Sequence, residues 1–400
     1  MKIQRRALPV AGFRAAGIHC GIKKEAPDLA LIVCDETANV AAVFTRSSIV
    51  GAPVEVSRER VKSGKTRGVV VNSGISNVAM GERGLRDARA MARIAASAVG
   101  CDEDEFLMAS TGVIGEPLPM DVLRRGIPAA ADQLSPDGFL AAAEAIRTTD
   151  THAKFASTRL RLGGRLVTIT GIAKGSGMIE PNMATMLSFI LTDAAASPGY
   201  LRRVLRGTAD ETYNRLTIDG EGSTSDTVLL LANARAGNPT LRSPKSRDAP
   251  AFEAAVHEVA TALTRDLARD GEGATKLVDV EVRGAVSPAE AERAARRIAN
   301  SMLVKTAIFG RDPNWGRILQ TVGAGGIRLR LPRTQVRLAG VTVFRNGSSA
   351  GPAARRRAFQ AMGASEIRIE VDLGVGSGRA CIWTCDLSYD YVKINAEYTT

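Results

Sequence analysis

The sequence predicts a layered α/β fold, because apolar strand-like runs alternate with amphipathic helical segments over its first hundred residues. The composition agrees with a globular protein, since 45% of the residues are hydrophobic and 24% are charged. A chain of 400 residues is long enough for two or three structural units. A glycine-rich stretch near the middle, residues 171–193, separates two halves of similar character.

The first elements follow from apolar runs and turn residues. Three runs are expected to form strands: residues 29–34, 40–44 and 67–74. The first two are expected to be joined by a turn at residues 35–39. Helical spacing predicts a helix over residues 85–99, which ends at Gly100 because glycine suits the left-handed position after a helix.

Later segments continue the alternation. Between Met120 and Arg147 we expect helices that break at Pro128 and Pro136. Gly163-Gly164 suits a hairpin turn between two strands. A strong amphipathic pattern predicts a helix over residues 252–269.

The last quarter of the chain begins with a helix signal and continues as strands. Asp312 followed by Pro313 is typical of a helix N-cap with proline at the first helical position. The strands expected after it are residues 328–331, 341–344, 367–371 and 380–387.

The charge and hydropathy of the chain exclude some classes of protein. The net charge of +11 is compatible with nucleic-acid binding, but the arginines are spread along the chain and aromatic residues make up only 4%. Anionic substrates are a sufficient reason for part of the positive charge. No apolar run approaches the roughly 18–20 residues of a membrane span, and no signal peptide is evident. We therefore expect a cytoplasmic protein that binds neither nucleic acid nor membrane.

The cysteines and histidines do not form a metal-binding pattern. There are five cysteines and three histidines, and the only close pair, Cys381 and Cys385, has no second pair to complete a zinc site. We expect no metal.

The central stretch suggests a chemical event in the chain itself. A small residue, Ala184, directly precedes Thr185, and an apolar run follows from Met186. Cleavage between Ala184 and Thr185 would free an α-amine with a pKa near ~8, which can act as the base for the threonine hydroxyl. From these residues alone, the alternative is the first turn of a buried strand or helix.

The stretch Lys-Gly-Ser-Gly-Met-Ile-Glu-Pro-Asn-Met-Ala-Thr-Met-Leu resembles the processing site of the ornithine acetyltransferases, the glutamate N-acetyltransferase family of arginine biosynthesis. The similarity extends over nearly the whole chain, through residues 11–17, 21–24, 72–74, 148–151, 214–219, 223–228 and 303–317. The chain departs from the family pattern at Ile75 and Met80, and Glu180 occupies a position expected to vary.

This resemblance implies an α/β fold of layered mixed sheets that cuts itself into two chains, residues 1–184 and 185–400, which remain associated. It implies transfer of an acetyl group from N2-acetyl-L-ornithine to L-glutamate through an acetyl-threonine at Thr185. No cofactor is implied, although acetyl-CoA is a possible co-substrate. Two copies of each fragment would form the assembly, a heterotetramer.

For some of the site residues that the family implies, the residue types themselves also suggest a chemical role. Thr111 and Gly112 end a strand-like run, and a hydroxyl beside a backbone N–H can stabilise an oxyanion. Glu272 lies between two glycines, so its carboxylate can approach a ligand closely. Alone, both segments would be read as simple turns.

The resemblance assigns Thr111 and Gly112 to the oxyanion hole and Lys174 to the substrate α-carboxylate. Glu272 would bind the amino-acid substrate, whose ornithine side chain ends in an ammonium group. The remaining substrate-binding positions are Thr148, Thr185, Asn395 and Thr400.

Three alternatives remain open at this point. A self-processing amidase or aminopeptidase would share the nucleophile but hydrolyse its substrate without transfer to glutamate. A paralogous acyltransferase would act on another acylated amino acid. A basic, non-catalytic binding protein would stay uncut and would associate with nucleic acid in a salt-dependent way.

Overall fold

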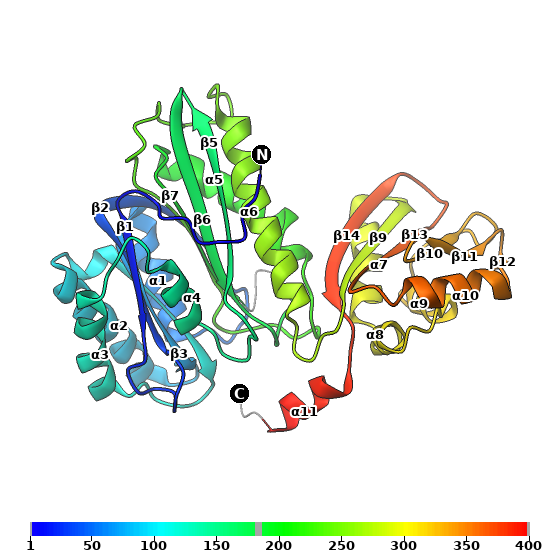
Figure 1. Ribbon diagram of the computed structural model, residues 1–400, viewed down its shortest axis with the longest axis horizontal. Coiled ribbons are helices and arrows are strands. Elements are labelled where there is room, and N and C mark those ends of the chain that lie inside the picture. Colours follow the sequence, from blue (N-terminus) through cyan, green and yellow to red (C-terminus); the bar gives the residue numbers. More distant parts are fainter. Residues whose placement is uncertain (1, 181–185, 398–400) are drawn as a thin grey trace.

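The computed structural model describes residues 2–180 and 186–397, which form two bodies joined side by side (Figure 1). Each body has one mixed β-sheet covered by helices. The layered α/β prediction is therefore confirmed. In the described part of the chain, no helix is both long and apolar enough to cross a membrane.

The sheet of the first body has the strand order β4-β3-β2-β8-β7-β6-β5, with β1 added beside β2. Two neighbouring pairs are parallel, β3 with β4 and β7 with β8, and the others are antiparallel. The strands are β1 (Phe13–Ile18), β2 (Leu29–Phe44), β3 (Lys65–Ile75), β4 (Phe106–Val113), β5 (Lys154–Leu162), β6 (Arg165–Lys174), β7 (Leu187–Thr192) and β8 (Thr227–Ala232).

The helices of the first body are α1 (Ala52–Arg60), α2 (Gly81–Val99), α3 (Met120–Asp132), α4 (Phe139–Ala145), α5 (Pro198–Glu211) and α6 (Ala249–Arg269). Apolar side chains of α1, α2 and α3 pack on β2, β3 and β4, while those of α5 and α6 pack on β5 to β8. A third core joins the inner faces of the two halves of the sheet, with Ile32 and Val69 on one side and Phe189 and Leu231 on the other. The sheet therefore folds over on itself, and its two halves lie between two layers of helices.

Strand β2 makes this fold-over possible, and here the prediction was wrong. The expected turn at residues 35–39 is part of one continuous strand of 16 residues. Its first part pairs with β3 and its last part with β8, and the register with β3 shifts between Val33 and Ala38. The polar residues that suggested a turn, Asp35 to Thr37, are exposed where the strand passes from one partner to the next.

The second body has the strand order β12-β11-β10-β13-β9-β14, in which only β9 and β13 are parallel. Its strands are β9 (Leu277–Ala285), β10 (Gln335–Leu338), β11 (Val341–Arg345), β12 (Ser348–Ser349), β13 (Glu366–Asp372) and β14 (Gly378–Cys385). Helices α7 (Pro288–Asn300), α8 (Met302–Phe309), α9 (Trp315–Ala324) and α10 (Pro352–Ala361) share one apolar core with them.

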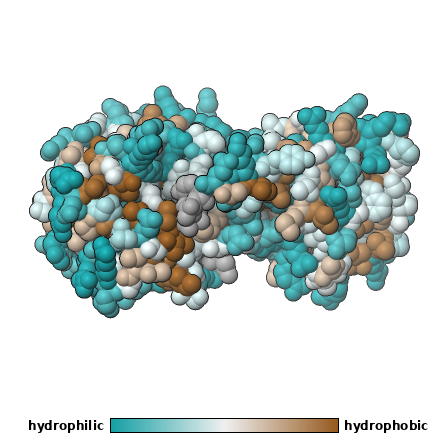
Figure 2. All heavy atoms as spheres, turned by 90° about the horizontal axis from the view of Figure 1, so that it is seen from below, coloured by the Kyte–Doolittle hydropathy of each residue, from teal (hydrophilic) through white to brown (hydrophobic). Residues whose placement is uncertain are grey.

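Two parts of the chain connect the bodies. Helix α6 leads into β9 through a short turn that contains Glu272. The last helix, α11 (Tyr389–Glu397), leaves β14 and runs back beneath the first body (Figure 1). In the view from below, hydrophilic side chains cover much of both bodies and the molecule narrows between them (Figure 2).

The expected cut lies between two strands that pair with each other. Lys174 at the end of β6 is the partner of Leu187 at the start of β7, so the chain leaves and re-enters the sheet at the same end of these two strands. Strand β7 lies between β6 and β8, and β8 pairs with β2. A break after residue 184 would thus leave both fragments joined by two strand ladders, β6–β7 and β2–β8.

Candidate active site

A cavity of about 320 Å³ lies where β4, β6, the turn after α6 and helix α11 converge. Segments far apart in the sequence supply its walls. The predicted site residues that line it are Thr111, Gly112, Thr148, Lys174, Glu272 and Asn395. Three others, Ala184, Thr185 and Thr400, lie outside the described residues.

Lys174 links two of the predicted hydroxyl residues. Its ammonium donates to Thr148 Oγ1 at 2.8 Å and to Thr111 Oγ1 at 3.2 Å. Burial lowers the pKa of Lys174, and the negative charge of Asp150 opposes this shift. Because Thr111 accepts from Lys174, its own O–H remains available as a donor, which an oxyanion-stabilising group requires.

Gly112 is required by the close approach of two strands. Strands β3 and β4 run parallel, and Gly112 is the register partner of Gly74. A Cβ on Gly112 would lie 2.2 Å from the Gly74 carbonyl carbon, and its φ is +127°. Only glycine fits this position without displacing the backbone of β3. The simple turn that Thr111 and Gly112 alone would suggest is instead part of β4, which continues to Val113.

Glu272 is held from three sides. Its backbone N–H donates to the Ser176 carbonyl at 2.7 Å, and its Oε2 accepts from Asn395 Nδ2 at 2.8 Å. Its side chain also lies directly against Gly177, where an added Cβ would be 2.4 Å from the carboxylate carbon. These contacts fix the carboxylate in place, and Glu272 as a whole is only 8% exposed.

Two further residues of the cavity were missed by the sequence analysis. Asp219 accepts from the backbone N–H groups of Met178 and Ile179 at 2.7 and 2.8 Å, so it holds the turn after β6. Tyr391 of α11 donates to Asp219 Oδ2 at 3.4 Å. Asp219 ends a segment that carries the family resemblance, residues 214–219, and Tyr391 lies four residues before the predicted Asn395, but nothing in the sequence indicated that they meet.

Asp226 lies beside the start of β7. Its Oδ1 accepts from the Met186 backbone N–H at 2.5 Å, and this amide joins Met186 to Thr185. Asp226 is 3% exposed, and its Oδ2 has no hydrogen-bond partner among the described residues. Burial raises the pKa of Asp226 well above its ordinary value, so the group is protonated well above the pH at which a free carboxyl ionises.

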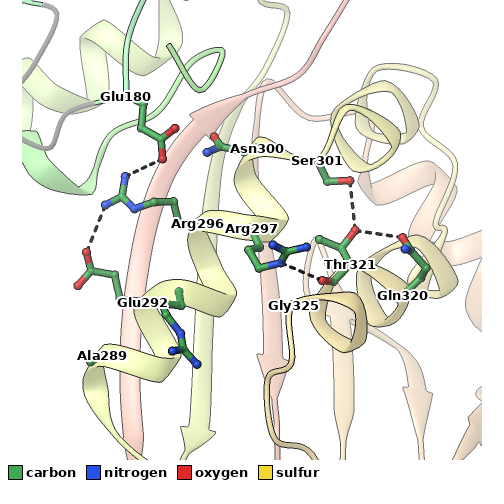
Figure 3. Close-up of a pocket in the computed structure, with 11 residues that line it drawn as sticks. Glu180, Ala289, Glu292, Arg296, Arg297, Asn300, Ser301, Gln320, Thr321 and Gly325 are labelled. Carbon is green, nitrogen blue, oxygen red and sulfur yellow. Dashed lines mark hydrogen bonds and ion pairs between the residues drawn. The ribbon is translucent and has the colours of Figure 1, made fainter. Parts of the chain in front are cut away.

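A larger groove of about 860 Å³ lies between the first body and helices α7 and α9 (Figure 3). Its central cation, Arg296, pairs with Glu180 at 3.5 Å and with Glu292 at 3.2 Å. Arg297 donates to the Thr321 carbonyl at 3.3 Å. Since these arginines are bound to protein groups and no predicted site residue lines the groove, we assign it to contact between the two bodies.

The described residues hold no cluster of three or more side chains that could bind a metal ion. Cys381 and Cys385 are on one strand, and burial raises the pKa of both thiols. The three remaining cysteines, Cys20, Cys34 and Cys101, are also free thiols.

The chain is similar to known proteins over nearly its whole length. Residues 14–400 match the model of the ArgJ family. The arginine biosynthesis bifunctional protein ArgJ of Geobacter sulfurreducens is 47% identical over 392 residues, which cover 98% of this chain and 100% of that protein. The protein of the same name from Symbiobacterium thermophilum is 46% identical over 395 residues, covering 98% and 97%.

A crystal structure is also similar to part of the chain. The arginine biosynthesis bifunctional protein argJ from Bacillus halodurans is 40% identical, with a TM-score of 0.51. The match covers 54% of this chain and 100% of that chain.

Proposed function

The chain belongs to the ArgJ family of arginine biosynthesis, and from this premise we propose that Thr185 carries the acetyl group between its two amino-acid substrates. The chain is an ornithine acetyltransferase, also called glutamate N-acetyltransferase. The observation that supports the proposal best is the convergence of six expected site residues on one cavity, at the sheet edge where the chain around Thr185 leaves and returns.

The first step is cleavage of the chain by its own threonine. The Thr185 hydroxyl attacks the Ala184 carbonyl carbon, and the C–N bond to the Thr185 nitrogen breaks. This leaves an ester on the hydroxyl and a free α-amine. Water then hydrolyses the ester, so Ala184 becomes a carboxylate. Thr111 and Gly112 donate to the oxyanion of each tetrahedral intermediate.

A size comparison supports this cut and the fragments 1–184 and 185–400. Residues 185–400 make up 54% of the 400 residues. The solved chain from Bacillus halodurans is matched over its whole length by 54% of this chain. A released fragment that begins at Thr185 would likewise contain 54% of the residues of this chain.

The second step is acetyl transfer by the mature Thr185. Its hydroxyl attacks the acetyl carbonyl of N2-acetyl-L-ornithine, the C–N bond breaks, and ornithine leaves with the proton taken from the hydroxyl. The α-amine of L-glutamate then attacks the acetyl ester, and Thr185 regains a proton as N-acetylglutamate forms. Each half-reaction passes through an oxyanion at the same donors, so one site serves both.

The substrate is held by groups whose chemistry matches it. Lys174 binds the α-carboxylate, because its ammonium lines the cavity. Glu272 binds the side-chain ammonium of ornithine, while Thr148 and Asn395 position the rest of the substrate together with Thr400. Charged groups recognise charged ends, and hydrogen bonds to charged groups are stronger than neutral ones.

We also propose acetyl-CoA as a second acetyl donor, because relatives that are 46–47% identical to this chain are called bifunctional. The test is incubation of the purified protein with acetyl-CoA and glutamate, followed by measurement of free thiol. Release of coenzyme A that requires glutamate supports the proposal, and its absence in a protein active with N2-acetyl-L-ornithine contradicts it.

Two broader expectations remain proposals: a cytoplasmic location and an assembly with two copies of each fragment. Light scattering of the purified protein measures the second, and a mass equal to one pair of fragments would contradict it.

Thr185→Ala tests the central proposal. The variant should show one full-length mass and form no N-acetylglutamate, because it lacks the hydroxyl that both steps use. Thr185→Ser keeps a hydroxyl and should retain cleavage. Normal cleavage or transfer by the alanine variant would contradict the assignment, whereas release of acetate without N-acetylglutamate from the wild type would indicate an amidase.

A further inference from the structure

Three buried charged residues lie together behind the cavity without lining it: Asp150, Lys154 and Asp270. The Lys154 ammonium lies 2.6 Å from Asp150 Oδ1 and 2.5 Å from Asp270 Oδ2. The side chains of Asp150 and Lys154 are fully buried, and that of Asp270 is 4% exposed. Charges this deeply buried are costly unless they are fully paired, so the arrangement calls for a reason.

Asp150 contacts the backbone of both segments that carry the proposed carboxylate site. Its Oδ1 also accepts from the Gly175 N–H at 2.6 Å, directly after Lys174. Its Oδ2 accepts from the Thr148 N–H at 3.1 Å. One carboxylate therefore fixes the positions of Lys174 and Thr148 relative to each other.

Asp270 connects the same cluster to the turn that carries Glu272. It caps the end of α6, two residues before Glu272, and accepts from the Thr151 N–H at 3.0 Å and from the Thr151 hydroxyl. A second link runs beside it, because Thr149 Oγ1 and Ser176 Oγ are 2.7 Å apart and the Ser176 carbonyl accepts from the Glu272 N–H.

Two carboxylates, Asp150 and Asp270, share the Lys154 ammonium, and each has a further basic group nearby. The charge of Lys174 acts on Asp150, and the His152 ring lies 3.4 Å from Asp270 Oδ1. Burial alone would raise the pKa of Asp150, but the charges of Lys154 and Lys174 and the Gly175 N–H hold it well below its ordinary value. Asp150 is thus ionised and supports the charged form of Lys174.

We propose that Asp150, Lys154 and Asp270 form a positioning unit that holds Lys174 aligned for the substrate carboxylate, and that within it Asp150 supplies the negative charge that favours the ammonium. This inference rests on the proposed function of the cavity. None of the three residues lines the cavity, so each would act through Lys174, Thr148 or the Glu272 turn. Because Asp150 and Lys154 precede the proposed cut and Asp270 follows it, the unit also ties the two fragments together at the site.

The charged groups around Lys174 determine how the unit is tested. Burial lowers the pKa of Lys174, as does the charge of Lys154, whereas Asp150, Glu272 and the ionised form of Asp226 raise it. Lys23 is a further cation that interacts with it. Lys174 binds a carboxylate as an ammonium, which is lost as pH rises through its pKa. Removing the charge of Asp150 lowers that pKa, so the basic limb of kcat/KM should move to lower pH.

The experiment measures kcat/KM for N2-acetyl-L-ornithine against pH in the wild type and in Asp150→Asn, Lys154→Met and the double variant. Asp150→Asn should move the basic limb down by about 1–3 pH units, the range for loss of a close opposite charge. Lys154→Met should move it up. In the double variant the two effects oppose each other, so the limb should return toward that of the wild type.

A matched control is Asp193→Asn. Asp193 is a buried carboxylate at the opposite end of β7 from the cavity, where it accepts from the Thr168 N–H at 2.8 Å. Its loss changes a buried charge without changing the surroundings of Lys174. The pH profile of this variant should match that of the wild type.

The outcomes separate this inference from the proposed function. A wild type that forms no N-acetylglutamate contradicts the function itself. If the wild type is active and folded Asp150→Asn keeps the wild-type limb, the positioning unit is refuted. If Asp150→Asn does not fold, the double variant is compared with Lys154→Met, since these two differ only at Asp150. Equal limbs in that pair would also refute it.

Discussion

Asn395, in the last helix, donates through its side-chain amide to Glu272 at 2.8 Å, across 123 residues of sequence. Helix α11 has no buried residue, so polar contacts such as this one hold it against the first body. Directly before this helix, the Ser388 hydroxyl donates to the Gly273 carbonyl at 2.6 Å. The end of the chain therefore completes one wall of the cavity.

Glu272→Gln should weaken the donor more than the acceptor. The change removes the negative charge proposed to bind the side-chain ammonium of ornithine, which glutamate lacks. Loss of a hydrogen bond to a charged group costs about 1.5–3 kcal/mol, so KM for N2-acetyl-L-ornithine should rise roughly ten- to a hundredfold. Steady-state kinetics with each substrate varied checks this. Glu258→Gln, on the exposed side of α6, is the control. Equal effects on the two substrates would argue against the role.

Gly177→Ala should disturb the same carboxylate from the opposite side. The added Cβ would lie 2.4 Å from the Glu272 carboxylate carbon, and Gly177 does not have a left-handed φ, so the side chain must move while the backbone is unstrained. We expect at least a tenfold rise in KM for the donor, with a melting temperature close to that of the wild type. Gly323→Ala meets nothing within 4 Å and serves as the control. An unchanged KM would mean that the position of Glu272 is not critical.

Thr111→Val should slow both cleavage and acetyl transfer. The variant keeps the shape of the side chain but loses the hydroxyl proposed to donate to the oxyanion. Removal of one such donor costs about 10²–10³ in rate. The rate of fragment appearance on a denaturing gel and kcat for transfer measure the two steps. Thr192→Val, at the far end of β7, is the matched control. A defect in only one step would show that the steps use different donors.

Asp226→Asn should change how stability depends on pH. The pKa of Asp226 is raised in the folded protein, so the folded state holds a proton that the unfolded state releases above about pH 4. Wild-type stability therefore falls as pH rises from that value toward the raised pKa. The variant has no ionisable group at this position, so its urea midpoint should fall less between pH 5 and pH 8 than that of the wild type. Exposed Asp137→Asn should behave as the wild type. If the urea midpoint of Asp226→Asn fell between pH 5 and pH 8 as much as that of the wild type, the raised pKa of Asp226 would be contradicted.

Local patterns were sufficient to predict several elements. The apolar positions of α6, such as Val256, Val259 and Leu263, are fully buried, as their helical spacing predicted. Gly163 and Gly164 form the hairpin between β5 and β6 with φ values of +55° and +81°. In both cases the information lies within a few neighbouring residues.

Other predictions failed because local signals competed. Pro128 does not break α3, since it is exposed and water can hydrogen-bond the carbonyl that its missing N–H leaves free. Asp312 does not cap α9. Asn314 does, because its side chain accepts from the Arg317 N–H at 3.1 Å. Residues 328–331 do not form a strand.

The geometry of the candidate site could be anticipated only in part. Motifs indicated Lys174 and Glu272, but neither spacing nor composition indicated that Asp150 and Asp270 share Lys154. Lys154 and Asp270 are 116 positions apart, and the contact between Lys154 and Asp150 depends on how the loop before β5 folds. The same holds for Asp226, whose contact with the Met186 amide follows from the order of strands β7 and β8.

The strand order has a consequence for the protein after its chain is cut. The proposed fragment 1–184 would hold β6 and β2, and the proposed fragment 185–400 would hold β7 and β8, so each would contain strands whose neighbours belong to the other. The uncut precursor regains this arrangement as a single molecule, whereas the mature protein must reassemble from two. If the cut occurs as proposed, the refolding rate of the cut protein should depend on the concentration of its fragments, because each fragment must first find the other.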